Sequence, residues 1–360
     1  MVKVVLTTFL LATWLLQSCA NDDSNVAEGG LPDAPCVRSE VLAKPAGGPA
    51  TVRVGVTGAL SEAAEYLADA EGYFAREGLR AQMINFPSAN RMLPALASGQ
   101  IDVGSANVGP GLFNAAGSNL CVKVVSSLTR QQPQANSVFL FARRDLLDGG
   151  KLHGYGDLRG MQIAIGIRDS SSEYALAKLL QAGGLALTDV HIQQMGSPAI
   201  LVSLANKSID AAVLPEATAS LAEDKGLGLK WKPVAEVVPD AQFGMLLFSP
   251  RFAAQRDAAV RWMTAYLQAA RDYDDAFFKN IRREEIVDQL VKSSPIKDSH
   301  LYDHMGFAMM DPNGGLNMDS VADQMRWLVA QGEVHQSVDL TQLVDMSYAQ
   351  AAVERLGAYQ

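Results

Sequence analysis

The sequence predicts an α/β protein of two lobes, each built on a wound, mostly parallel β-sheet with flanking helices. Apolar strand-like segments alternate with amphipathic helices over residues 51–250, which is typical of parallel βαβ units. Residues 96–103 (LASGQIDV) are echoed by residues 204–211 (LANKSIDA). In both segments a helix ends, the chain turns, and Ile-Asp enters an apolar strand. The echo occurs only twice, so it indicates two lobes of one type rather than a solenoid.

The individual elements follow from hydrophobic periodicity and from capping and turn residues. For the first lobe we expect strands at residues 52–56, 81–86, 101–104 and 122–128, and helices over 60–74, 91–97 and 108–116. For the second lobe we expect strands at 138–142, 162–165, 190–194 and 209–214, with helices beginning near residues 170, 197 and 215. Ser170 and Glu173 have the spacing of a capping box.

From residue 250 onward the pattern is almost wholly helical, including residues 260–278, 283–291 and 321–328. These segments predict a first lobe made of residues 51–135 and 242–360 and a second lobe made of residues 136–241. With 360 residues, the chain is long enough for two such cores.

The charge balance argues against nucleic acid as a partner. The formal net charge is −9, and the basic residues are dispersed along the chain. A protein that binds a phosphate backbone needs clustered Lys and Arg side chains.

The N-terminal segment has the features of an export signal. Residues 4–16 are mainly apolar, but the run is shorter than the roughly 20 residues that span a bilayer. Residues 1–18 therefore predict a cleaved signal peptide. The sequence Leu-Gln-Ser-Cys at 16–19 resembles the lipobox of bacterial lipoproteins, which implies lipidation of Cys19. In the alternative, the signal is an ordinary one and Cys19 is incidental.

Residues 19–50 are polar and rich in Gly and Pro, which predicts a flexible tether. Two further cysteines follow, Cys36 at the end of this stretch and Cys121 at the head of an apolar run. In an oxidising compartment they could form a disulfide. Alternatively, Cys121 is a buried thiol.

Four segments, in order, resemble one known family. They are residues 72–79 (GYFAREGL), 95–104 (ALASGQIDVG), 157–164 (DLRGMQIA) and 185–190 (LALTDV). These are similar to motifs of the nitrate/sulfonate/taurine and thiamine-pyrimidine (NMT1-like) substrate-binding proteins of ABC importers. The resemblance implies a type II periplasmic-binding-protein fold, with a ligand cleft between the lobes and crossing strands near residues 134–141 and 241–248.

In wound sheets, ligands lie beyond the carboxyl ends of the strands. The loops expected there are residues 58–60, 105–107, 170–172, 196–197 and 214–216. Serines at the start of a helix, near its unpaired N–H groups, suit an anionic group, although they could be caps alone. Arg130 and Arg168 could supply countercharge, and Glu216 could instead serve the helix dipole. The predicted ligand-binding residues are Leu60, Ser105, Asn107, Ser170, Ser171, Ser172 and Glu216.

The resulting prediction is an extracytoplasmic receptor for an ABC importer, not an enzyme and without a cofactor. It captures a small polar or anionic organic molecule and delivers it to a membrane permease that works with an ATPase. We expect a monomer held at the periplasmic or extracellular face by its lipid. A ligand-binding sensor module is the alternative.

An enzyme related to the pyrimidine synthases of this fold is disfavoured, because their Cys-rich motif is absent from the sequence. His300 and His304 have helical spacing, but no third metal ligand is apparent, so we expect no metal site.

Overall fold

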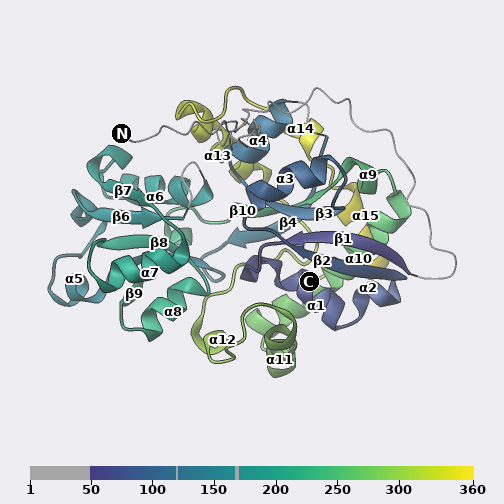
Figure 1. The fold of residues 1–360 in the computed structure, drawn as a ribbon, viewed down its shortest axis with the longest axis horizontal. Helices are drawn as coiled ribbons and strands as arrows, with labels where there is room; N and C mark the ends of the chain where they lie inside the picture. Colours follow the sequence, from purple (N-terminus) through teal and green to yellow (C-terminus); the bar gives the residue numbers. More distant parts are fainter. Residues whose placement is uncertain (1–48, 119–120, 167–169) are drawn as a thin grey trace, which may run out of the picture. The chain divides into compact units, whose positions relative to one another are not determined.

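The structure, a computed structural model, describes residues 49–118, 121–166 and 170–360. All of these residues belong to the same unit of the fold. Within it, two β-sheets with flanking helices form two lobes (Figure 1). The sequence-predicted class, an α/β protein with two wound sheets of one type, is therefore confirmed.

The first sheet contains β1 (Ala50–Val56), β2 (Leu79–Asn85), β3 (Val103–Asn107), β4 (Lys123–Gln131) and β10 (Ala241–Phe248). Its strand order is β2-β1-β3-β10-β4. Strand β1 pairs in parallel with β2 and β3, whereas β10 runs antiparallel to β3 and β4. The sheet is therefore mixed, with one reversed strand that returns from the second lobe. We call this sheet and the helices packed on it the first lobe.

The second sheet repeats this arrangement. It contains β5 (Val138–Arg143), β6 (Gln162–Ile165), β7 (His191–Gln194), β8 (Ala211–Pro215) and β9 (Gly228–Pro233), in the order β7-β6-β8-β5-β9. Strand β6 is parallel to β7 and β8, and β5 is antiparallel to β8 and β9. This sheet and its helices form the second lobe.

Helices connect the strands in both lobes. In the first lobe they are η1 (Leu60–Glu62), α1 (Ala63–Ala70), α2 (Tyr73–Arg76), α3 (Ala89–Ala97) and α4 (Pro110–Gly117). In the second lobe they are α5 (Arg144–Asp148), η2 (Tyr155–Leu158), α6 (Ser171–Ala182), η3 (Leu187–Asp189), α7 (Ser197–Ala205), α8 (Thr218–Asp224) and η4 (Val234–Glu236).

The C-terminal third is helical, as its periodicity predicts. It contains α9 (Pro250–Ala253), α10 (Arg256–Phe278), α11 (Arg283–Ser293), α12 (Leu301–His304), α13 (Met318–Ala330), α14 (Leu340–Leu343) and α15 (Ser347–Leu356). Helix α10 places Trp262, Tyr266 and Tyr273 on one buried stripe in the core of the first lobe. Helix α13 also packs on the first lobe, where Val321, Met325 and Leu328 join its second apolar cluster.

The repeated Ile-Asp segment has a structural role. In the first lobe, Asp102 accepts a hydrogen bond from the backbone N–H of Arg53 at 2.9 Å and pairs with the guanidinium groups of Arg53 and Arg251. In the second lobe, Asp210 accepts from the backbone N–H of Gln162 at 2.9 Å and pairs with Arg143. Each aspartate therefore holds the strand next to its own, in the middle of β1 in the first lobe and at the start of β6 in the second, which gives the echo the same role in both lobes.

Three local predictions are wrong in detail. Strand β3 starts later than expected and includes Ser105 and Asn107, because β10 pairs alongside it as far as residue 107. The helix expected over 60–74 is divided, and Gly72 adopts a left-handed φ of 71° between α1 and α2. Ser170 is the N-cap residue of α6, but its side chain makes no capping hydrogen bond.

The predicted signal peptide, its Cys19 and the tether lie outside the described residues. Cys121 is disulfide-bonded, so the alternative of a buried free thiol is wrong. Cys36, the partner predicted from the sequence, lies outside the described residues.

Candidate functional site

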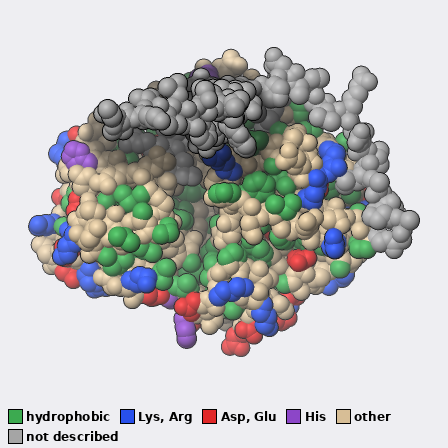
Figure 2. Space-filling model, in the orientation of Figure 1, with side chains coloured by type: hydrophobic (Ala, Val, Ile, Leu, Met, Phe, Trp, Pro, Cys, Tyr) green, Lys and Arg blue, Asp and Glu red, His purple; other side chains and the backbone are tan. Residues whose placement is uncertain are grey.

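A cavity of about 340 Å³ lies where the carboxyl ends of strands from both lobes meet. On the face shown in Figure 2, a furrow separates the surfaces of the two lobes and is bordered mostly by hydrophobic and uncharged side chains. All seven residues predicted from the sequence line this cavity: Leu60, Ser105, Asn107, Ser170, Ser171, Ser172 and Glu216. The structure therefore brings the whole predicted set together, while Gly196 and Ser197 do not line it.

The first lobe contributes the loop after β1 and the end of β3. Leu60 begins η1 and is buried against the core of that lobe. Ser105 and Asn107 point to the same face of the sheet because side chains alternate along β3. Ser105 is buried, whereas Asn107 at the strand end is exposed.

The second lobe contributes the start of α6. Ser170, Ser171 and Ser172 line the cavity where the first N–H groups of this helix lie. The Ser171 hydroxyl donates a hydrogen bond of 3.0 Å to the carbonyl oxygen of Val108 in the first lobe. This serine therefore offers a ligand only the lone pairs of its oxygen, and it also ties the two lobes together.

Glu216 is held by the protein itself. One of its carboxylate oxygens accepts from Lys230 Nζ at 3.1 Å and from the Gly306 N–H at 2.9 Å. The other accepts from the Ser220 N–H at 3.0 Å. The side chain is fully buried, so Glu216 forms part of the wall and its charge is balanced by Lys230. These contacts favour the interpretation that Glu216 serves the start of helix α8 rather than a ligand.

Sequence reasoning missed most of the remaining wall. Thr57, Ser88, Thr129 and Ser137 add hydroxyl groups, and apolar surface comes from Leu128, Val138, Phe243, Ala308 and Met310. The amide of Gln131 exchanges two hydrogen bonds with Ser137, at 3.2 and 2.9 Å, and so fixes the connection between β4 and β5. No local sequence signal marks these residues, because the connection and the C-terminal segment reach the cavity only through the tertiary fold.

Tyr273 is the missed residue with the clearest chemical signal. It lies on α10, lines the cavity and is fully buried. Its hydroxyl has no hydrogen-bond partner among the described residues. A buried unsatisfied hydroxyl is costly, so it is well suited to a bond that a ligand would complete. Desolvation raises the pKa of Tyr273 well above its ordinary value, so the group stays neutral.

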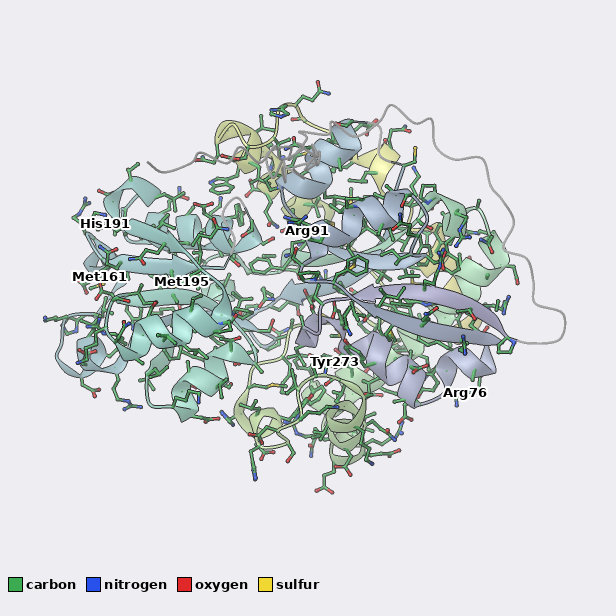
Figure 3. The ribbon with its side chains drawn as sticks, in the orientation of Figure 1. Arg76, Arg91, Met161, His191, Met195 and Tyr273 are labelled. Carbon is green, nitrogen blue, oxygen red and sulfur yellow. The ribbon has the colours of Figure 1, made fainter. Side chains whose placement is uncertain are left out.

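The described lining carries almost no charge. Glu216 is its only charged residue, and none of its members is Lys, Arg, His, Asp or Cys. Arg130, a predicted countercharge, is engaged with Asp240 and Asp311 at 3.3 and 2.8 Å and is not in the lining. The other, Arg168, lies outside the described residues. Arg91 on α3 lies at the side of the first lobe that faces the second lobe (Figure 3) and likewise is not in the lining.

The one carboxylate of the described lining, that of Glu216, is already paired with Lys230. The serines of this lining have no His, Lys or Asp beside them in the wall to act as a base. No cluster of three or more His, Cys, Asp or Glu side chains that could hold a metal ion occurs in the described part of the chain. Nε2 of His304 pairs with Asp224 at 3.1 Å, whereas the His300 side chain is 90% exposed.

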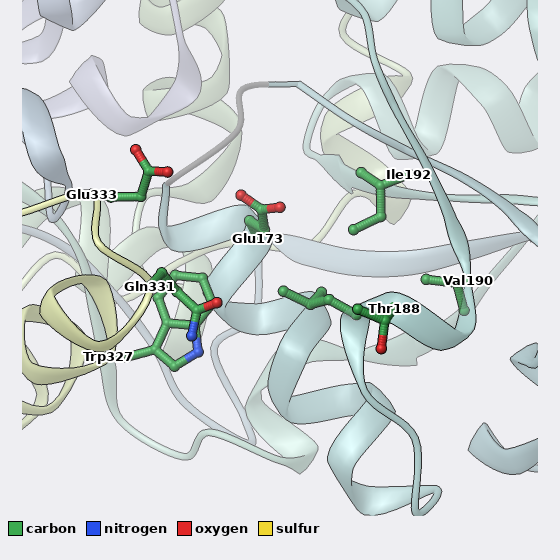
Figure 4. A pocket seen from close by; sticks show the side chains of 8 residues that line it. Glu173, Thr188, Val190, Ile192, Trp327, Gln331 and Glu333 are labelled. Atoms are coloured by element: carbon green, nitrogen blue, oxygen red, sulfur yellow. The ribbon is translucent and has the colours of Figure 1, made fainter.

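The two lobes contact each other beside the cavity through α6 and α13. The Tyr174 hydroxyl donates a 2.6 Å hydrogen bond to Asp323 Oδ2, and its ring meets Trp327 edge to face at 5.7 Å. A second cavity of about 290 Å³ opens next to this contact, with Glu173, Trp327 and Glu333 in its wall (Figure 4). It contains none of the predicted ligand-binding residues.

Known proteins share the sequence pattern and the fold. Riboflavin-binding protein RibY of Chloroflexus aurantiacus is 32% identical over 133 residues, which is 36% of this chain and 35% of RibY. The aliphatic sulphonate-binding protein SsuA of Escherichia coli has a similar structure, with a TM-score of 0.66 at 21% identity over 82% of this chain and 92% of that one. The desulfurization enzyme DszB has a TM-score of 0.61 at 13% identity over 85% and 99% of the two chains.

The structural likenesses confirm the type II periplasmic-binding-protein fold. Because this fold occurs both in binding proteins and in an enzyme, the fold alone does not distinguish binding from catalysis. Among the described residues, no helix combines the length and apolar character that crossing a bilayer requires. The family model described as "NMT1-like family" matches residues 46–291, about two thirds of the chain. The chain therefore belongs to the NMT1-like family.

Proposed function

We propose that the protein is the solute-binding receptor of an ABC importer and that it binds an uncharged polar organic molecule between its lobes. The observation that carries this proposal is the cavity lined by strand ends and helix starts of both lobes. In wound sheets this is the position of the ligand. The described wall offers hydroxyls, amides and apolar surface but no acid–base set, which favours binding over catalysis.

The ligand class follows from the charge and hydrogen-bonding state of the wall. A buried anionic group would need a cation or several N–H donors. The described lining contains no Lys or Arg, so the N–H groups at the start of α6 would be left to balance the charge without a cation, which favours an uncharged polar group at this position. Leu128, Phe243 and Met310 favour an apolar or aromatic part of the ligand, while Ser105 and Asn107 suit a polar edge. The similarity to a riboflavin-binding protein is consistent with an uncharged ring system.

The proposal includes the cellular arrangement expected from the N-terminal sequence. Cys19 carries a lipid, residues 19–50 form a tether, and the receptor works as a monomer at the periplasmic or extracellular face. It delivers its ligand to a permease driven by an ATPase. The proposed lobe boundaries, residues 51–135 with 242–360 and residues 136–241, fall near the two connections between the sheets.

A thermal-shift screen tests the function. The panel contains flavins, pyrimidines, other neutral heterocycles, sulfonates, carboxylates and nitrate. A compound present at a hundred times its dissociation constant should add about 2.7 kcal/mol to the free energy of unfolding. We expect neutral compounds among the hits. A screen in which no compound shifts the melting temperature, with protein freed of retained ligand by refolding, would count against a receptor.

Variants then test the site with the best compound. Tyr273→Phe should melt higher than the parent without ligand, because an unsatisfied buried hydroxyl is removed, yet bind at least tenfold more weakly, which is about 1.4 kcal/mol. Ser170→Ala with Ser172→Ala should also weaken binding. Ser197→Ala is the matched control, because Ser197 starts α7 outside the cavity and should leave the affinity unchanged.

A further inference from the structure

The loop after β1 turns its backbone N–H groups toward one buried carboxylate. Glu62 accepts hydrogen bonds from the N–H groups of Thr57, Gly58 and Ala59, the shortest to each being 2.8, 2.8 and 3.2 Å. It also accepts from the Thr57 hydroxyl at 2.9 Å. Successive N–H groups that converge in this way form a concave site of the type that binds anions. In this chain the anion in that position is the side chain of Glu62.

This arrangement lies at the wall of the cavity. Thr57, Ala59, Leu60 and Ser61 line the cavity, and Glu62 is the next residue along the chain. Its side chain is nearly inaccessible, with the residue only 1% exposed. Among the ion pairs of the described residues, none involves Glu62, so the loop N–H groups provide its compensation.

A second buried carboxyl, that of Glu65, lies beside Glu62 but lacks such a set of N–H donors. Glu65 lies one turn further along α1, and its Oε2 has no hydrogen-bond partner among the described residues. Desolvation, together with the charge of Glu62, raises the pKa of Glu65 well above its ordinary value of 4.5. Burial also raises the pKa of Glu62, but the Thr57, Gly58 and Ala59 hydrogen bonds oppose that rise.

We infer that Glu62 determines ligand specificity by filling, with its own carboxylate, the anion-binding position at the first-lobe side of the cavity. The three N–H groups that could hold an anionic part of a ligand are already used. Thr57 likewise offers a ligand only the lone pairs of its hydroxyl. The inference rests on the proposed receptor function, because it explains why the cavity selects uncharged ligands.

Truncation of Glu62 tests this role by chemical rescue. Glu62→Ala removes the carboxylate and leaves a hole lined by three N–H donors, so the melting temperature should fall. Formate at about ten times its dissociation constant should then raise the melting temperature by about 2 °C through mass action. Formamide, the uncharged analogue, should not do so. Sodium chloride at equal ionic strength sets the baseline.

The matched control is Glu65→Ala, which removes an equally buried carboxyl from the same segment but opens no set of N–H donors. This variant and the wild type should show no response to formate beyond the chloride baseline. A Glu62→Ala protein that formate and nitrate do not stabilise would overturn the inference. If Glu62→Ala does not fold, the wild type decides, since a formate or nitrate shift in the wild type equally overturns the inference.

The same measurements separate this inference from the proposed function. If neutral compounds bind the wild type and formate fails to rescue Glu62→Ala, the specificity role fails and the receptor function stands. If no compound binds but the rescue succeeds, the receptor function fails while Glu62 remains the internal anion of the loop.

Discussion

Ligand affinity should depend on a hydrogen bond between the lobes that lies outside the cavity. The Tyr174 hydroxyl on α6 donates to Asp323 on α13, and α13 packs on the first lobe. In the proposed receptor the lobes separate when the ligand is released, and this separation would break the bond. Tyr174→Phe should therefore destabilise the ligand-bound form and leave the open form unchanged.

The size of the effect follows from the environment of the bond. A hydrogen bond to a charged group contributes about 1.5–3 kcal/mol. The Asp323 side chain is 42% exposed and also pairs with Lys178 at 3.4 Å, so water and Lys178 compensate part of the loss. The lower end of the range applies, about 1.5 kcal/mol, which corresponds to a roughly tenfold higher dissociation constant.

The assay is isothermal titration with the best compound from the thermal-shift screen. Tyr348→Phe is the matched control, because its hydroxyl donates a 2.7 Å bond to the carbonyl oxygen of Ala253 within the first lobe. That variant should melt lower than the parent but bind the compound equally well. Equal affinities for Tyr174→Phe and the parent, or equal losses in both variants, would refute the reasoning.

The pH dependence of affinity provides a second check on the same contact. The hydrogen bond from Tyr174 lowers the pKa of Asp323 below its ordinary value of 3.8. A carboxylate with a depressed pKa contributes its stabilisation above its ordinary pKa and loses it as the pH falls through the lowered value. The ratio of the wild-type and Tyr174→Phe affinities should therefore be constant from pH 8 to 5 and decline only under more acidic conditions.

Three further predictions concern the anchor, the disulfide and the repeated aspartates. Cys19→Ser should release the protein from membranes or block its processing, and a mature N-terminus other than Cys19 in mass spectrometry would contradict lipidation. Non-reducing peptide mapping should link Cys121 to Cys36, since a lipidated Cys19 has no thiol to offer; a Cys19–Cys121 peptide would refute both assignments. Asp102→Asn should lower the free energy of unfolding by about 3 kcal/mol, because it leaves two arginines around a buried site. Asp210→Asn should lower it by only about 1 kcal/mol, because the Asp210 side chain is 25% exposed. Equal melting temperatures for the two variants would contradict this difference.

Two features of the fold could be predicted from sequence because local chemistry specifies them. The Ile-Asp echo marks equivalent strands, since an aspartate that fixes the neighbouring strand must follow the same turn in each lobe. The start of α6 was predictable from its serines. The exact start of β3 was not, because it depends on pairing with β10, which comes some 140 residues later in the chain.

The residues that sequence reasoning missed are those whose role depends on what faces them. On α10, Tyr273 has the spacing of an ordinary core aromatic, and only its unpaired hydroxyl at the cavity distinguishes it from Tyr266. Glu62 resembles a solvent-exposed acid at the start of a helix, a position that the dipole alone would favour. Its burial and its three N–H donors become apparent only when the preceding loop folds back onto it.

The charge of the ligand depends on whether the N–H groups of the loops face a ligand or a side chain of the protein itself. From sequence, the loops after the strands and the helix starts could favour anions, because both present N–H groups and a partial positive charge. In the structure, the N–H groups of the loop after β1 donate to Glu62. The carboxylate in the second-lobe wall, that of Glu216, is paired with Lys230. The same backbone geometry can therefore bind an anion or exclude one, depending on whether an internal side chain occupies it. A relative of this fold with an apolar or small residue in place of Glu62 would keep those N–H groups available, and we expect such a relative to accept anionic ligands at this position.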